Sequence, residues 1–276
     1  MYLKHIRSAL KFNTRVLDFI HLSALYFYVS SRFPCNSSGC VTPNKGFSIV
    51  TFNTHLGGVN PDFKTLYPLS DVTARMPADV MVFQEVVQGD NIESITVPST
   101  ARVFSKILDP SYSRVINNEE RKGSLSTFIA SSLPVLDEMS WVLAPFSQKA
   151  QAQVQLILLE TSLGKVWFAG VHLSAQHVPL LSTVHFNDLS RKVKMLTGKG
   201  LPVIVAGDHN LWGRVVRPLA PKGAIFASKS PTWPSSNVKH CIDHVWGTGV
   251  KLHGFAGANV GSDHLPVFAH VTELSK

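Results

Sequence analysis

The chain alternates short apolar runs with polar stretches, and the apolar runs have the length and composition of buried strands. They are rich in Val, Ile and Phe, and Gly, Pro, Asn, Asp or Ser residues interrupt the chain between them. Strands that are buried on both faces need helices or a second sheet to cover them, so the pattern indicates a layered α/β fold. It predicts strands at residues 47–52, 79–83, 125–130, 154–159, 166–171, 203–207, 241–246 and 265–271.

Two other stretches carry apolar residues at helical intervals. Residues 63–72 place Phe and Leu three residues apart, and residues 189–196 place Leu and Val three or four apart, with cations on the opposite side. We therefore expect an amphipathic helix in each. Residues 88–122 are polar and irregular, which predicts a long surface excursion.

Polar residues that could bind a metal ion, transfer a proton or contact a phosphate lie at or beside the ends of six of the predicted strands. Asp and Asn are poor strand formers, and any one of them can be explained as a turn or capping residue. Six strand ends with this property favour a functional interpretation, because ligands bind where strand ends converge in layered α/β folds. The residues concerned are Asn53, Gln84, Glu85, His172, Asp208, Asn210, Asp243, Asp263 and His264.

The positive charge of the chain is concentrated near its N-terminus. The formal net charge is +8, of which residues 1–46 supply +5 and the remaining 230 residues only +3. We find no dense run of Lys and Arg, so the composition does not predict a track for a polyanion. A mildly basic domain remains compatible with a phosphate-bearing substrate.

Residues 1–46 are predicted to be an extension that precedes a domain at 47–276. Residues 1–15 are basic, and residues 16–29 are apolar but interrupted by Asp18 and His21. Fourteen such residues are fewer than the roughly 20 that span a bilayer. The core of a signal peptide, an amphipathic helix within residues 1–31 that lies on a membrane, and an extension unrelated to the fold all stay open. The sequence therefore leaves a cytoplasmic and an exported protein as alternatives.

The cysteines, histidines and tryptophans allow several interpretations. Cys35 and Cys40 could close a small loop in an oxidising compartment or stay reduced. Cys241 and His244 suggest zinc, but on an alternating strand they would face opposite sides, so we disfavour a zinc site. Further residues could line the site or a binding surface, and for these we favour packing or a place in the wall of the site: His55, His209, Trp212 and Trp233.

Six fragments together resemble one family, the endonuclease/exonuclease/phosphatase (DNase I-like) superfamily. Each fragment is weak alone, but they follow one another in the family's order and span residues 47–272. The resemblance implies a four-layer α/β/β/α sandwich of two mainly antiparallel sheets. The fragments are TFNTH (51–55), VFQEV (82–86), GVHLS (170–174), AGDHN (206–210), CIDHV (241–245) and GSDHLPV (261–267).

The resemblance also implies a divalent metal ion. It assigns Glu85 as the carboxylate that binds the metal, Asn53 as the amide beside it, and Asp263 as a further ligand. Mg²⁺ fits such a sparse oxygen shell, because it keeps waters and substrate phosphate in its remaining positions. We expect Mg²⁺ as the cofactor, with Mn²⁺ as a possible substitute.

The remaining motif residues are implied to act on the substrate. Asp208 and Asn210 would orient the attacking water and the phosphate oxygens, and His264 would be the general base. Asp243 would hold the ring of that histidine. His172 would donate to the phosphate or to the leaving group, so that Asn210, His172 and Asn53 contact the substrate.

The sequence therefore predicts a monomeric, metal-dependent phosphoesterase that hydrolyses a phosphodiester, either as a nuclease or as a phosphodiesterase for small molecules. Alternatives are cleavage of a phospholipid, an inositol-phosphate phosphatase, and a non-catalytic protein that binds phosphorylated ligands. Nucleic acid is a candidate partner, but two departures from the family weaken it. The QEVV stretch (84–87) lacks a following Arg, and Ser132 stands where many relatives carry Arg or Lys.

Overall fold

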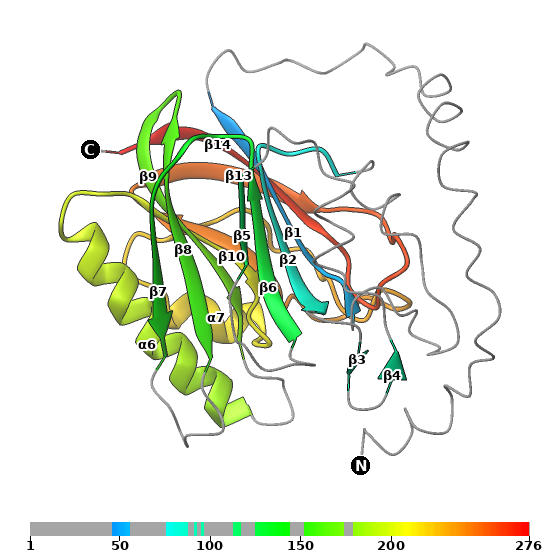
Figure 1. The fold of residues 1–276 in the computed structure, drawn as a ribbon. Coiled ribbons are helices and arrows are strands. Elements are labelled where there is room, and N and C mark those ends of the chain that lie inside the picture. The colour runs from blue at the N-terminus through cyan, green and yellow to red at the C-terminus, as the bar shows by residue number, and fades with distance from the viewer. Residues whose placement is uncertain are drawn as a thin grey trace, which may run out of the picture. The chain divides into compact units, whose positions relative to one another are not determined.

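A computed structural model describes most of the predicted domain. The described residues are 46–55, 76–87, 91–92, 95–96, 113–116, 125–143, 152–173 and 179–275. All of them belong to one compact unit, Lys45–Lys276. Figure 1 shows two sheets packed face to face, with two helices against one of them.

The first sheet has six strands in the order β13-β14-β1-β2-β6-β5. Its centre is the parallel pair β1–β2, and the other neighbours in it are antiparallel. Residues of β1 and β2 are almost completely buried, which explains why both read as continuous apolar runs. The strands are β1 (Phe47–Asn53), β2 (Val80–Val87), β5 (Ser113–Ile116), β6 (Leu125–Ser131), β13 (Val250–Ala256) and β14 (Val267–Leu274).

The second sheet also has six strands, in the order β11-β12-β10-β9-β8-β7. It too contains one parallel pair, β9–β10, among antiparallel neighbours. The two sheets are therefore mainly antiparallel, as expected. Its strands are β7 (Val135–Val142), β8 (Gln153–Thr161), β9 (Gly164–His172), β10 (Val203–Asp208), β11 (Ile225–Phe226) and β12 (Asp243–Thr248), and a separate two-stranded sheet pairs β3 (Asn91–Ile92) with β4 (Ile95–Thr96).

Three apolar clusters hold these layers together. One lies between the sheets and joins residues such as Ile49 and Val82 to Phe168 and Ile204. A second packs α6 (Pro179–Thr197) and α7 (Gly213–Leu219) onto the outer face of the second sheet. The third buries the outer face of the first sheet. Burial of one large apolar side chain stabilises a fold by about 1.5–3 kcal/mol. The three clusters therefore hold the sheets and the helices together as packed layers.

Most predicted elements are confirmed, with corrections at their ends. The second predicted strand extends past residue 83, so that Glu85 lies inside β2, and the strand predicted at 241–246 begins only at Asp243. The prediction of an irregular surface excursion at 88–122 was wrong in part, because this segment contains the strands β3, β4 and β5. The strands β7 and β13 and the short helix α7 were missed.

Other predictions lie outside the described residues. These are the helix at 63–72, the extension at 1–46 and the pairing of Cys35 with Cys40. Within the described part of the chain, no helix has both the length and the apolar character needed to cross a bilayer.

Candidate active site

Three polar side chains stand in a row across adjacent strands of the second sheet. In the register of the sheet, Asp208 at the end of β10 pairs with His172 at the end of β9 on one side. On the other side it pairs with Asp243 at the start of β12. Neighbouring strands lie about 4.8 Å apart, so this register brings together residues that are far apart in the sequence.

The first sheet contributes Asn53 and Glu85 from the ends of its parallel pair. The Asn53 Nδ2 group donates to Glu85 Oε1 at 3.1 Å and to Asp208 Oδ2 at 3.0 Å, so one amide joins carboxylates of both sheets. The Asn53 Oδ1 atom accepts the backbone N–H of His55 at 2.9 Å. Asn53 was predicted to bind metal and substrate, and the structure adds that its amide fixes the distance between two carboxylates.

Glu85 reaches the site through an irregularity of β2. Its backbone φ is +55°, and the register between β2 and β6 shifts between Phe83 and Val86. A non-glycine residue in this conformation costs about 1–3 kcal/mol, and such strain is concentrated at functional sites. The bulge interrupts the alternation of the strand and turns the Glu85 carboxylate toward Asn53.

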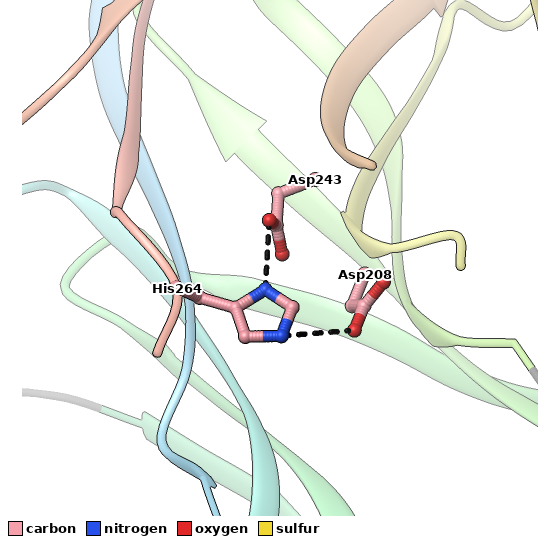
Figure 2. A group of neighbouring side chains, drawn as sticks. All are labelled: Asp208, Asp243 and His264. Carbon is pink, nitrogen blue, oxygen red and sulfur yellow. Dashed lines mark hydrogen bonds and ion pairs between the residues drawn. The ribbon is translucent and has the colours of Figure 1, made fainter. Parts of the chain in front are cut away.

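His264 and Asp243 form a hydrogen-bonded pair (Figure 2). The Nδ1–H of His264 donates to Asp243 Oδ2 at 2.9 Å, and both side chains are buried. The other ring nitrogen, Nε2, lies 3.8 Å from Asp208 Oδ2 and 3.9 Å from Asp263 Oδ1. The imidazole is therefore held at one nitrogen and faces two further carboxylates with the other.

Ser262 anchors the loop that carries His264. Its hydroxyl donates to the backbone carbonyl of Asn53 at 2.8 Å and accepts the backbone N–H of His264 at 3.1 Å. The loop between β13 and β14 is thus tied to the end of β1. This contact places the histidine above the same strand ends that carry the carboxylates.

The turn after β10 holds Asn210. Its backbone has a φ of +50°, and its N–H donates to Asp208 Oδ1 at 2.7 Å. Its Nδ2 donates to the carbonyl of Leu173 at 2.9 Å, which leaves the second amide hydrogen for another acceptor. Gly207 is required just before this turn, since a Cβ there would lie 1.9 Å from the carbonyl oxygen of Val171.

His172 lies at the outer edge of the site. Its Nε2 is 4.0 Å from Glu85 Oε1 and 3.9 Å from Asp208 Oδ2. The side chain keeps 22% of its surface exposed, whereas Asp208 keeps 1%. Of the residues that the motifs single out, His172 is therefore among those most open to a ligand.

Asp263 is surrounded by aromatic and imidazole groups. The indole N–H of Trp233 donates to Asp263 Oδ2 at 3.1 Å, and His55 Nε2 lies 4.0 Å from the same oxygen. Trp233 was predicted to serve in packing or in the wall of the site, and its hydrogen bond to Asp263 was not predicted. No motif signals it, because Trp233 comes from a loop remote in sequence from Asp263.

The carboxylates shift the pKa values of Asp208 and His264 upward. Burial, followed by the charge of Asp243, raises the pKa of Asp208 to about 6. For His264 burial alone would lower the pKa, but the hydrogen-bonded Asp243 and the charges of Asp208 and Asp263 outweigh it and raise the pKa to about 10. The protein without metal therefore holds an imidazolium at neutral pH.

The donor atoms of the site fit a hard divalent cation. Asp208, Asp243 and His264 each offer an atom within 4.8 Å of the others, the one such group of three in the part of the chain that the structure describes. Asp243 Oδ1 is buried and accepts no hydrogen bond from the described residues. Carboxylate oxygens are the ligands that Mg²⁺ prefers. Of the predicted metal ligands, Glu85 and Asn53 touch each other, while the contacts of Asp263 run to Trp233, His55 and His264.

The prediction that Cys241 and His244 face opposite sides of one strand was wrong. Cys241 precedes β12, and its Sγ lies 3.6 Å from His244 Nδ1 instead of on the opposite side. The Nε2–H of His244 donates to the carbonyl of Leu211 at 3.1 Å, so both ring nitrogens already have partners. The pair is a partly buried hydrogen-bonded contact behind the site.

The fold and the site define a class: two-sheet α/β proteins in which a histidine–aspartate pair and further carboxylates gather where strands of both sheets end. The sequence matches the Endonuclease/Exonuclease/phosphatase family over residues 50–264, and the chain belongs to that family. No curated protein matches the chain significantly.

Solved structures of the same superfamily share the fold. D. rerio TDP2 complexed with a single-strand DNA product is 17% identical, with a TM-score of 0.61 over 82% of this chain and 98% of that chain. The mannosyl-6-phosphatase of Bacteroides thetaiotaomicron is 14% identical, with a TM-score of 0.61 over 81% and 98% of the two chains. The human Nocturnin catalytic domain with a bound sulfate anion is 16% identical, with a TM-score of 0.61 over 82% and 94%. The fold class implied by the sequence, an α/β sandwich of two mainly antiparallel sheets, is thereby confirmed, and the helices that the structure describes cover the second sheet.

Proposed function

We propose that this protein is a divalent-metal-dependent phosphoesterase that hydrolyses a phosphodiester by attack of an activated water. The observation that carries the proposal is the His264 ring, held by Asp243 at Nδ1 and facing Asp208 and Asp263 at Nε2. A ring fixed at one nitrogen can accept a proton only at the other, which makes His264 Nε2 the candidate general base.

Asp208 is suited to orient the attacking water. Its Oδ2 lies 3.8 Å from His264 Nε2, a separation that a water hydrogen-bonded to both atoms can span. Asn53 and the backbone of Asn210 hold the Asp208 carboxylate in place through one oxygen each. Proton transfer to His264 would then leave an imidazolium that Asp243 stabilises.

The cation completes this chemistry. Mg²⁺, or Mn²⁺ in its place, would be held by Glu85 with Asn53 and Asp263, would neutralise charge on the phosphate oxygens, and would lower the pKa of His264 toward neutrality by repulsion. His172 and the remaining amide hydrogen of Asn210 are the donors available to the phosphate oxygens. Both sit beside Asp208, where the developing negative charge would lie.

The charge of the site favours a diester over a monoester. Within the described residues, the hydrogen bonds and ion pairs of Asp208, Asp243 and Asp263 run to histidine, asparagine, tryptophan, serine and backbone groups, with no Lys or Arg. A diester carries one negative charge near neutral pH and a monoester close to two, so a site whose described carboxylates contact no Lys or Arg suits the diester better. The single-strand DNA product bound by D. rerio TDP2 supports the same class of substrate.

A substrate panel with and without metal tests the proposal. Bis-p-nitrophenyl phosphate, p-nitrophenyl phosphate, plasmid DNA, RNA, sphingomyelin and phosphoinositides would each be incubated with Mg²⁺ and with EDTA. We expect hydrolysis of bis-p-nitrophenyl phosphate to exceed that of p-nitrophenyl phosphate, and to stop in EDTA and return with Mg²⁺ or Mn²⁺. Hydrolysis that persists in EDTA, or a protein inert toward all six substrates, contradicts the proposal.

A further inference from the structure

A stack of aromatic rings leads from the surface to the candidate base. The Arg214 guanidinium lies 4.3 Å above the Trp212 ring, and Trp212 stacks on His240 at 5.4 Å with 17° between the planes. Trp233 also stacks on His240, at 5.8 Å and 29°, and its ring lies 6.5 Å from that of His264. We call Trp212, His240 and Trp233 the aromatic ladder.

The ladder is built on the same segments that hold the reacting groups. Trp212 follows Asn210 by two residues, and Trp233 donates its indole N–H to Asp263. The backbones of Trp233 and His240 exchange N–H···O bonds in both directions, at 2.9 and 3.0 Å. The ladder therefore has a fixed position relative to His264, as a substrate subsite requires.

Trp212 is the exposed end of the ladder. His240 stacks on both tryptophans and so has less ring surface to offer a further planar group. The Arg214 guanidinium lies over the Trp212 ring, the Arg214 side chain is exposed, and Trp212 itself keeps 38% of its surface exposed. A guanidinium on an exposed ring is weakly held and can move to an anion.

The segment that carries the ladder is the basic part of the domain. Residues 209–242 contain five Lys or Arg residues and no Asp or Glu, although residues 47–276 as a whole have a net charge of only +3. These cations form no consecutive run, because they are spaced along a turn, a helix and loops: Arg214, Arg217, Lys222, Lys229 and Lys239. The cations thus accompany the aromatic surface beside the site.

We propose that the outer end of the ladder is a subsite for a single-stranded polynucleotide whose scissile phosphate lies at His264. An unpaired base stacks on Trp212, and Arg214 leaves the ring to bind a neighbouring phosphate. Three ring-to-ring steps separate Trp212 from His264, so the subsite serves nucleotides near the cleaved bond. A duplex is excluded as the ligand here because its bases already stack on one another. The inference rests on the proposed function, since it assigns a substrate class to that site.

Binding without catalysis separates this inference from the proposed function. Fluorescence anisotropy of a labelled oligothymidylate would be followed with the full chain in EDTA, for the wild type, Trp212→Ala, Trp212→Phe and Arg214→Ala. We expect Trp212→Ala to weaken binding about 10- to 100-fold, the size of one base–aromatic stack, and Trp212→Phe to restore most of it. Arg214→Ala should reduce the slope of log Kd against log salt by about 1.

Matched controls come from a second cation–ring pair. Lys192 Nζ lies 6.0 Å over the Trp141 ring, on α6 and β7, so Trp141→Ala and Lys192→Ala remove a similar contact elsewhere. These controls should bind the oligonucleotide like the wild type. In the turnover assay, Trp212→Ala should lower kcat/KM for the oligonucleotide at least about tenfold more than for bis-p-nitrophenyl phosphate.

Several outcomes overturn the inference. These are oligonucleotide binding unchanged by Trp212→Ala, equal losses on the oligonucleotide and on bis-p-nitrophenyl phosphate, and binding to phosphatidylserine vesicles in place of oligothymidylate. If the wild type binds the oligonucleotide through Trp212 but hydrolyses no diester with Mg²⁺, the subsite stands and the proposed function falls. If the protein hydrolyses bis-p-nitrophenyl phosphate but its binding of the oligonucleotide does not depend on Trp212, the proposed function stands and the subsite falls.

Discussion

The dipeptide Asp-His occurs at three places around the candidate site, and its two side chains are placed in two different ways. At 208–209 and 243–244 the aspartate faces the site, and the histidine is buried behind it among Phe186, Phe226 and Trp246. At 263–264 the histidine faces the other two aspartates. The difference follows from the backbone: side chains alternate along β10 and β12, whereas 263–264 lies in a loop.

The surroundings of each histidine decide its chemistry. His209 donates from Nδ1 to the carbonyl of Gly207 and accepts the indole N–H of Trp246 at Nε2, which fixes a neutral ring. Burial lowers the pKa of His209 well below its ordinary value and that of His244 to about 4. His264 is equally enclosed, yet its aspartate neighbours raise its pKa to about 10. Burial outweighs the other influences on the pKa of His209 and of His244, whereas the carboxylates around His264 outweigh burial.

Removing the ring of His264 should have the largest effect. His264→Ala takes away the proton acceptor, so kcat for bis-p-nitrophenyl phosphate with Mg²⁺ should fall about 100- to 10,000-fold. His253→Ala, which removes an exposed histidine of β13, is the matched control and should keep wild-type turnover. Turnover close to wild type in His264→Ala refutes the role of general base.

Neutralising the Asp208 carboxylate should have the second-largest effect on kcat. Asp208→Asn keeps the shape of the side chain but places an amide N–H₂ opposite donors of Asn53 or Asn210, so the attacking water loses its acceptor. We expect kcat to fall about 100-fold or more while circular dichroism shows a folded protein. A variant that is active with Mg²⁺ shows that Asp208 only supports the structure.

Trp246→Phe should affect stability and spare turnover. The substitution keeps a ring but leaves His209 Nε2 buried without a donor, which costs about 1–3 kcal/mol. The Tm should fall by about 2–4 °C for each kcal/mol of stability that is lost in a domain of this size, and kcat should stay nearly unchanged. A large loss of kcat with an unchanged Tm means that the buried histidines take part in the reaction, and the contrast with His264 disappears.

The free energy of unfolding should respond to pH in opposite directions for His264 and His244. His264 has its pKa raised from 6.5 to about 10 on folding, so it stabilises the metal-free protein fully below pH 6.5, and this stabilisation is lost as pH rises toward 10. His244 has its pKa lowered to about 4, so its contribution increases as pH rises from 4 to 6.5. Urea unfolding in EDTA at several pH values, for the wild type, His264→Gln and His244→Gln, measures each contribution by difference. Parallel curves for all three proteins contradict the assignment.

Much of the fold and the motif residues could be predicted because they depend on local sequence. The apolar runs that became β1, β9 and β10 are almost continuously buried, and continuous burial leaves a strong signal. β7 is an edge strand with mostly exposed residues, and such a strand carries little apolar pattern. β13 does alternate between buried and exposed positions, and that period-two pattern was overlooked.

The site was predictable to the extent that its residues lie in motifs. Asn53, Glu85, His172, Asp208, Asp243 and His264 do gather, while their catalytic roles stay predictions. Contacts that no motif carries were missed: Trp233 on Asp263 and the aromatic ladder. They join residues that are far apart in the sequence and whose approach depends on how the whole chain folds, so no local pattern specifies it.

The central claim is that Asp243, Asp208 and Asp263 make His264, alone among these three histidines, the proton-accepting group of a metal-dependent site. NMR titration of the histidine Cε1–H signals, with and without saturating Mg²⁺, tests it most directly. We predict that the His264 pKa is near 10 without metal and falls toward neutrality with Mg²⁺, while the His244 pKa is about 4 and burial keeps the pKa of His209 well below its ordinary value. A His264 pKa that stays near 6.5 in both conditions would contradict the account.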